Sequence, residues 1–125
     1  MTAILDAGAL IAIDRRDRHV GALLRVLQRE GIPVRTSAGV VAQVWRDGRK
    51  QANLARLLPG IAVVAIDDIS SRRIGELLRA SGTADLVDAH VALLSAPGDH
   101  MLTGDRDDID ALLRVRQVPT LLVKL

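Results

Sequence analysis

Apolar and polar positions in this chain follow two different periods, one typical of strands and one typical of helices. Five short segments bounded by turn residues predict strands, at 1–5, 33–36, 61–66, 101–103 and 120–123. The segments between them repeat apolar residues at helical spacing, at 9–13, 19–30, 37–47, 49–58, 67–80, 84–95 and 107–115. Because strands alternate with helices along the whole chain, we expect an α/β fold with three layers, α/β/α, around a central parallel sheet of four to five strands.

Capping residues predict where some of these elements begin. Asp6-Ala7-Gly8 reads as the turn after the first strand, and Ser37 is placed to cap the helix that follows the second. Thr83 is the expected N-cap of the helix at 84–95. No linker, repeat or low-complexity segment interrupts the pattern, so we expect a single domain over residues 1–125.

Composition narrows the possible classes of protein. The chain has no Phe or Tyr and a single Trp, Trp45, so its core must be aliphatic. It has no cysteine, which excludes disulfides and thiolate chemistry and suits a reducing compartment. No apolar run approaches the roughly 20 residues that span a bilayer, and the first residues do not resemble a secretory signal. We therefore expect a cytoplasmic protein without a membrane segment.

The charge distribution indicates a nucleic-acid partner. Net charge is +2, and arginine supplies nearly all of the positive charge, since lysine occurs only at Lys50 and Lys124. The arginines form small groups, at 15, 16 and 18, at 46 and 49, at 72 and 73, and at 114 and 116. Guanidinium groups bind phosphate through paired hydrogen bonds. The alternative is that these arginines only solvate ordinary helix surfaces.

Aspartates stand where predicted strands end or helices begin. Asp6 follows the first strand, Asp105 follows the strand at 101–103, and Asp85 and Asp88 open an apolar helix. Ligands of an open parallel sheet bind at the carboxyl ends of its strands, so these side chains are expected to meet there. Crowded carboxylates repel one another, and a hard cation such as Mg²⁺ or Mn²⁺ would relieve the repulsion.

Each aspartate also has a structural interpretation. Asp6 is a good helix N-cap, and acids in a first helical turn, such as Asp85 and Asp88, are favoured by the helix dipole. Asp88 lies among apolar residues and would need a partner if buried, so it is expected to be the inner residue of the two. Of Asp105, Asp107 and Asp108, one is expected to cap the last helix while the others extend the cluster. His90 is expected to point away from Asp88 as a structural histidine.

Three segments together resemble the PIN domain, and within it the VapC-type toxins of bacterial toxin–antitoxin pairs. Ile4–Ile11 resembles the first acidic motif of that family, Asp85–Ala92 its helix motif, and Leu102–Asp108 its strand-end Thr-x-Asp motif. The resemblance implies a Mg²⁺- or Mn²⁺-dependent endoribonuclease that cleaves RNA, with a small antitoxin partner and a homodimeric state. It implies Asp6, Asp88 and Asp105 as metal ligands, with Asp85 and Asp107 or Asp108 as auxiliary residues.

Gln43 departs from the pattern of that family. A glutamate is usual in the helix after the second strand, and Gln43 occupies this segment here, so it is a candidate catalytic residue that keeps an oxygen but lacks the charge. Weaker cation binding is expected, and a catalytically weak or inactive module that binds RNA or protein is the alternative. A phosphoryl-accepting domain is disfavoured, because Ala7 and Gly8 replace the acids it would need after the first strand.

Overall fold

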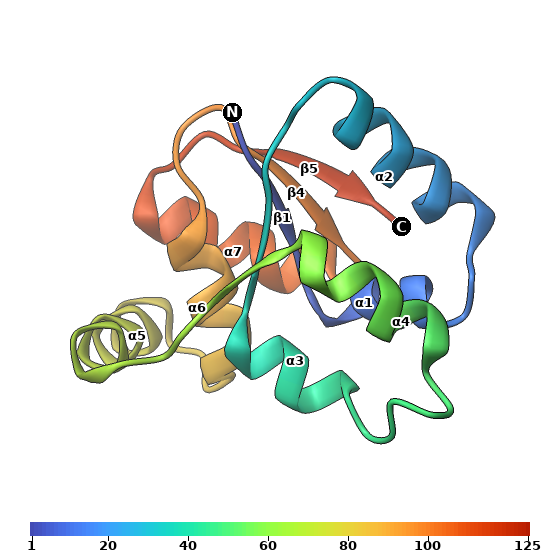
Figure 1. The fold of residues 1–125 in the computed structure, drawn as a ribbon. Helices are drawn as coiled ribbons and strands as arrows, with labels where there is room; N and C mark the ends of the chain where they lie inside the picture. The colour runs from blue at the N-terminus through green and yellow to red at the C-terminus, as the bar shows by residue number, and fades with distance from the viewer.

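The computed structural model describes residues 1–125 and contains five strands and seven α-helices (Figure 1). The strands are β1 (Ala3–Leu5), β2 (Val34–Ser37), β3 (Ala62–Val64), β4 (His100–Thr103) and β5 (Leu121–Lys124). The helices are α1 (Ala7–Asp14), α2 (Arg18–Arg29), α3 (Ala38–Val44), α4 (Ala52–Leu57), α5 (Asp68–Ser81), α6 (Leu86–Leu94) and α7 (Arg106–Arg116), with a short 3₁₀ turn, η1 (Leu58–Gly60), after α4.

The five strands form one parallel sheet in the order β3-β2-β1-β4-β5. The chain first builds outward from β1 to one edge and then returns to build β4 and β5 on the other side, so the strand order reverses next to β1. Leu5 is in register with Thr36 of β2 and Leu102 of β4. The three central strands therefore end at the same level, and the residues that follow them share one edge of the sheet.

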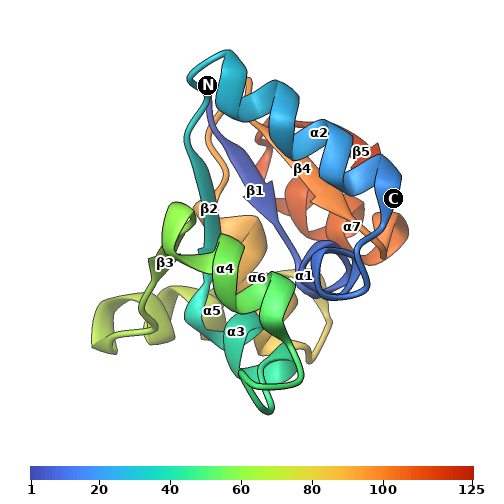
Figure 2. The same ribbon diagram turned by 45° about the vertical axis from the view of Figure 1, so that its right-hand side comes forward.

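Helices cover both faces of the sheet, as the sequence predicts. Helices α1, α2 and α4 lie on one side and α5, α6 and α7 on the other, while α3 lies at the carboxyl edge between the two groups (Figures 1 and 2). The prediction of a three-layer α/β/α fold with four to five parallel strands is confirmed.

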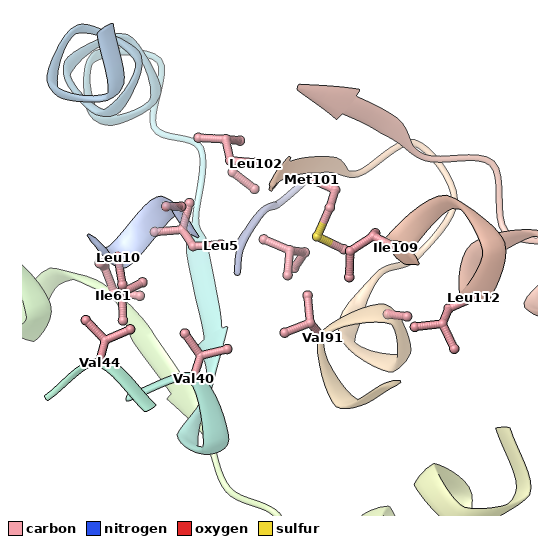
Figure 3. Packing of buried hydrophobic residues seen from close by; sticks show 14 of the residues in the cluster. Leu5, Leu10, Val40, Val44, Ile61, Val91, Met101, Leu102, Ile109 and Leu112 are labelled. Atoms are coloured by element: carbon pink, nitrogen blue, oxygen red, sulfur yellow. The ribbon is translucent and has the colours of Figure 1, made fainter. Parts of the chain in front are cut away.

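The core between these layers is aliphatic. Met101 of β4 extends toward Ile109 of α7 on one face of the sheet, and Leu5 and Leu10 pack on the other (Figure 3). All four side chains are fully buried. Trp45, the lone aromatic residue, is more than one-third exposed and lies outside this core. None of the helices is long and apolar enough to cross a membrane.

Several element boundaries differ from those predicted. Helix α1 begins directly at Ala7, so Gly8 belongs to its first turn rather than to a separate loop. The helix predicted over 37–47 ends at Val44, because the buried side chain of Gln51 accepts hydrogen bonds from the backbone N–H groups of Arg46 and Asp47 and holds them in a loop. The strand predicted over 61–66 shortens to Ala62–Val64, since it pairs only with β2 at the edge of the sheet.

Candidate metal centre

Asp6 leaves the central strand β1 and enters the edge of the sheet where the strand order reverses. Its carboxylate is nearly fully buried. One oxygen, Oδ1, accepts the N–H of Ala9 and caps α1, as the structural interpretation predicts. The other oxygen, Oδ2, accepts hydrogen bonds from the Thr103 hydroxyl at 2.5 Å and the Gly104 N–H at 3.1 Å. Asp6 therefore caps a helix and also ties β1 to the end of β4.

Thr103 is the link between Asp6 and Asp105. Its fully buried hydroxyl donates to Asp6 and accepts the backbone N–H of Asp105 at 2.8 Å. Thr103 therefore fixes the position of Asp105 through the backbone of that residue. The β-branched residue that ends the strand thus has a polar role that composition alone does not reveal.

Two glycines allow the turns after β1 and β4 to touch. A Cβ on Gly8 would lie 2.9 Å from the backbone N and Cα of Gly104, and a Cβ on Gly104 would lie 3.4 Å from the Cα of Gly8. This close approach brings the Gly104 N–H to the Asp6 carboxylate. Gly8 therefore serves packing between two backbone segments, and its φ is not in the left-handed region.

Helix α6 begins with Asp85, not with Thr83. The Asp85 carboxylate accepts the N–H groups of Val87 and Asp88 at 3.0 and 2.9 Å, so Asp85 is the N-cap and the prediction for Thr83 is wrong. The Thr83 hydroxyl instead pairs with that of Ser81. Asp caps more strongly than Thr, which explains the later start. Asp88 follows in the first turn of α6, where its carboxylate lies near those of the residues after β4.

Three carboxylates meet where α6 and α7 begin. Asp88, Asp105 and Asp108 each offer one oxygen, and these oxygens lie within 4.8 Å of one another. Asp88 is half-buried, whereas Asp105 and Asp108 are exposed. The sequence predicts all three, but it does not predict that Asp6 stays beside this group, with its oxygens engaged by Thr103, Gly104 and Ala9, instead of joining it.

Two of the three carboxyl groups, those of Asp88 and Asp108, have raised pKa values. Burial, followed by the charges of Asp85, Asp105, Asp6 and Asp108, raises the pKa of Asp88 to about 6. A hydrogen bond with Asp105, and then the charge of that residue, raise the pKa of Asp108 above its ordinary value. Neither of the two ion pairs in the structure, Arg72–Asp68 and Arg114–Asp110, reaches this group, so no side-chain cation neutralises it.

The remaining predicted site residues lie near the carboxylates without joining them. Gln43 is exposed on α3, one turn after Gly39, where an added Cβ would lie 3.1 Å from Val87 of α6. This spacing places Gln43 on the side of α3 that faces α6, but its side chain makes no hydrogen bond to an acid. Asp107 is exposed, and its charge contributes to the raised pKa of Asp108. Asp105 occupies the N-cap position of α7 without a capping hydrogen bond.

His90 points away from the carboxylates, as predicted. Its ring is buried, and Nδ1 is hydrogen-bonded to the hydroxyl of Ser37 at the end of β2. That hydroxyl also accepts the N–H of Gly39, so Ser37 caps α3 as the sequence predicts. His90 is therefore a structural residue.

The donor set of Asp88, Asp105 and Asp108 fits a hard divalent cation. All three donors are carboxylate oxygens, the ligands that Mg²⁺ and Mn²⁺ prefer. Around an octahedral ion with bonds of 2.0–2.1 Å, neighbouring oxygens lie about 3 Å apart and opposite ones about 4.2 Å apart, so the three side chains would draw closer together on binding a cation. The unneutralised charge around Asp88 supplies the electrostatic reason for a cation to bind.

Fold and site together define a parallel α/β domain with an acidic centre at its switch point. No family model and no curated protein matches the sequence. Among solved structures, a chain of VapBC2 from Rickettsia felis, crystallised with a DNA fragment from its promoter, has the same fold. The match has a TM-score of 0.70 and covers 99% of this chain and 100% of the other, at 16% sequence identity. The PIN-like fold implied by the sequence resemblance is thereby confirmed.

Proposed function

We propose that this chain is a VapC-type toxin, a single PIN-like domain over residues 1–125 that cleaves RNA in the cytoplasm as a divalent-metal-dependent endoribonuclease. The observation that carries the proposal is the convergence of Asp88, Asp105 and Asp108 at one edge of the sheet. The shared fold of the VapBC2 chain supports it. Asp6 and Asp85 take part by fixing the strands and the helix on which these carboxylates stand.

Different aspartates have different roles in the proposed phosphodiester cleavage. Asp88, Asp105 and Asp108 would hold Mg²⁺ or Mn²⁺, which supplies a Lewis acid for the scissile phosphate and an activated water. Asp6 keeps Asp105 in place through Thr103. The uncompensated carboxylates repel phosphate until their charge is neutralised, so the approach of the scissile phosphate to Asp88 and its neighbours depends on the cation, whereas binding of the flanking backbone elsewhere does not.

Substitution of the carboxylates by amides tests the proposal. Asp88→Asn and Asp105→Asn should each lower Mn²⁺-dependent cleavage of a fluorescent RNA by more than about a hundredfold, with an unchanged circular dichroism spectrum. Asp110→Asn is the matched control, because Asp110 lies on the same helix as Asp108 but pairs with Arg114. Cleavage that persists in Asp88→Asn and Asp105→Asn, or in excess chelator, would remove these residues from the site.

Asp6→Asn is a less specific test of the same site. The amide of Asn presents two donors and one acceptor, whereas Asp6 faces donors from Thr103, Gly104 and Ala9. The substitution should therefore lower stability as well as cleavage. Urea unfolding measured beside the cleavage assay separates the two effects.

A catalytically weak or inactive module that binds RNA or protein is the second candidate function. The observation that favours it is Gln43, which is exposed on α3 and adds no charge to the acidic centre. Under this alternative, the purified protein binds RNA in Mn²⁺ but leaves it intact. Gel analysis of the RNA after incubation, with chelator as the control, distinguishes the two functions.

We also propose a cognate antitoxin as partner and a homodimer as the assembled state. The structure matched is that of a VapBC2 complex, which supports the first of these. Exposed apolar side chains such as Trp45 and Val63 offer surface for protein contacts. Sedimentation analysis of the purified chain, alone and co-expressed with the protein encoded beside it, tests both.

A further inference from the structure

An arginine-lined groove separates α2 from α4 on the face of the molecule that also carries α1. It has a volume of about 720 Å³ and is lined by four arginines, Arg16, Arg18, Arg25 and Arg56. Asp17 is its single acidic residue, and the carboxylate of Asp17 is engaged in capping α2 by accepting the N–H of Val20. The groove therefore has a clear excess of positive charge.

These arginines have no carboxylate partners. The two ion pairs of the structure lie on α5 and α7, on the other side of the sheet from α2 and α4 (Figures 1 and 2). All four groove arginines are exposed. Arg56 makes a hydrogen bond only to the neutral side chain of Asn53 within α4. Their guanidinium charges are thus available to an anionic ligand.

Two arginines of α2 belong to a stripe of groove-lining residues along one face of that helix. Arg18, Gly21, Arg25 and Gln28 are spaced by three or four residues, so they share one face of the helix. The stripe is about 15 Å long, which corresponds to about four phosphates along one strand of a duplex. Gly21 leaves the middle of the stripe open, because a Cβ there would meet only a guanidinium nitrogen of Arg25 at 3.6 Å.

Helix α1 connects this groove to the acidic centre. Asp6 caps the start of α1 and Ile13, near its end, lines the groove. Ile13 is seven positions after Asp6, which corresponds to about 10 Å along the helix. From Ile13 the chain turns through Arg16, which has a left-handed backbone with φ +58° and belongs to the groove wall. A strand bound at the acidic centre can therefore continue into the groove.

We propose that the groove between α2 and α4 binds the phosphate backbone of the RNA substrate beside the scissile bond. This inference rests on the proposed function, since it takes RNA as the substrate. An acidic peptide would also be attracted by the arginines, but only three of the 11 lining residues are hydrophobic, which leaves few apolar anchors for a peptide. Phosphate, by contrast, matches the planar fork of each guanidinium.

A pair of substitutions at Gly21 tests the groove by charge alone. Gly21→Glu places a carboxylate between Arg18 and Arg25, whereas Gly21→Gln adds a neutral side chain of the same size. Both should fold, because the position is helical and open. Binding of a fluorescein-labelled RNA hairpin is measured by anisotropy in EDTA, so that cleavage does not interfere. We expect Gly21→Glu to weaken binding about tenfold or more and Gly21→Gln to leave it within about twofold of wild type.

Removal of single arginines gives a second, independent readout. Arg16→Gln and Arg56→Gln should each weaken binding about threefold to tenfold and reduce the slope of log affinity against log salt by about 0.7 to 0.9. Arg72→Gln on α5 is the control, since Arg72 is equally basic and exposed but lies away from the groove.

The outcomes separate this inference from the nuclease proposal. Equal RNA affinity of wild type, Gly21→Glu and the two arginine variants, or no measurable binding by wild type, would overturn the groove as an RNA site. Competition by poly-glutamate peptide that is lost in Gly21→Glu, with RNA affinity unchanged, would assign the groove to an acidic peptide instead. Loss of cleavage in Asp88→Asn with RNA binding retained supports both proposals, and binding without any cleavage by wild type refutes only the nuclease.

Discussion

Asp6 shows that one carboxylate can cap a helix and also support the acidic centre beside it. The two oxygens of its carboxylate point to different partners, the N-terminus of α1 and the turn after β4. From sequence position alone, Asp6 fits a helix cap and a metal ligand equally well. In the folded chain the cap fixes α1 while the second oxygen fixes the Thr103–Asp105 segment, so the acidic centre depends on both.

Substitution of Thr103 tests the link between Asp6 and Asp105. Thr103→Val keeps the shape of the side chain but removes the donor to the buried Asp6 carboxylate and the acceptor for the Asp105 N–H. We expect a loss of about 1–3 kcal/mol in the free energy of unfolding and weaker Mn²⁺ binding. Urea unfolding and titration calorimetry measure these effects. Thr103→Ser retains the hydroxyl and should restore most of both, and equal behaviour of the two variants would contradict the role of the hydroxyl.

Gln43 offers a gain-of-function experiment at the same scale. Gln43→Glu adds a carboxylate on the side of α3 that faces α6, where a cation at Asp88 would attract it. Mn²⁺ should bind severalfold more tightly in calorimetry, and metal-dependent cleavage should rise. Gln51→Glu is not a suitable control, since Gln51 is buried and holds a loop, so Gln117→Glu at the exposed C-terminal end of α7 serves instead. Unchanged Mn²⁺ affinity in Gln43→Glu would place Gln43 outside the metal site.

At the scale of elements, the site depends on how closely two turns approach. Gly8→Ala would put a methyl group 2.9 Å from backbone atoms of Gly104, and backbone cannot move aside as a flexible side chain can. We expect a loss of about 1–3 kcal/mol in unfolding free energy and a weaker metal site. Gly75→Ala in the middle of α5 meets no atom within 4 Å and should instead gain about 0.5–1 kcal/mol. Equal stability changes for the two glycines in urea unfolding would exclude the packing role of Gly8.

The order and type of the elements could be predicted from the sequence, because apolar periodicity is a local property. The boundaries of these elements were harder to predict where a side chain outside the element, or a competing capping residue, decides them. Asp85 displaces Thr83 as N-cap because it accepts two N–H groups. Gln51 ends α3 by accepting the backbone N–H groups of Arg46 and Asp47, five and four residues before it. The same limit applies to the site. The aspartates were visible in the sequence, but the turn-to-turn contact of Gly8 and Gly104 and the stripe of Arg18 and Arg25 opposite Arg56 exist only in three dimensions.

At the scale of the whole molecule, Ser37 and His90 join the end of β2 and the start of α3 to α6, a helix on one side of the sheet. Ser37 ends β2 and caps α3, while His90 lies on α6, and their hydrogen bond is buried. The Ser37 hydroxyl, which also accepts the Gly39 N–H, donates to Nδ1 or accepts from it according to the tautomer of the ring. Burial lowers the pKa of His90, the nearby charge of Arg35 lowers it further, and the charge of Asp67 opposes them. The native state therefore favours neutral His90.

This preference makes global stability depend on pH in a defined direction. Below about 6.5, the ordinary value for His, the unfolded chain binds a proton at His90 that the native state resists. The contribution of His90 is thus complete above pH 6.5 and is lost as pH falls toward its lower native pKa. Asp88 acts in the opposite sense, because its raised pKa of about 6 makes the native state bind its proton more readily than the unfolded chain.

A single stability curve would mix the two effects, but His90→Asn keeps Asp88 and places an amide where Nδ1 stood. Unfolding free energies of both proteins, measured in urea with chelator between pH 5 and 8, should differ most above pH 6.5 and converge at lower pH. Parallel curves would show that His90 does not change its protonation on unfolding.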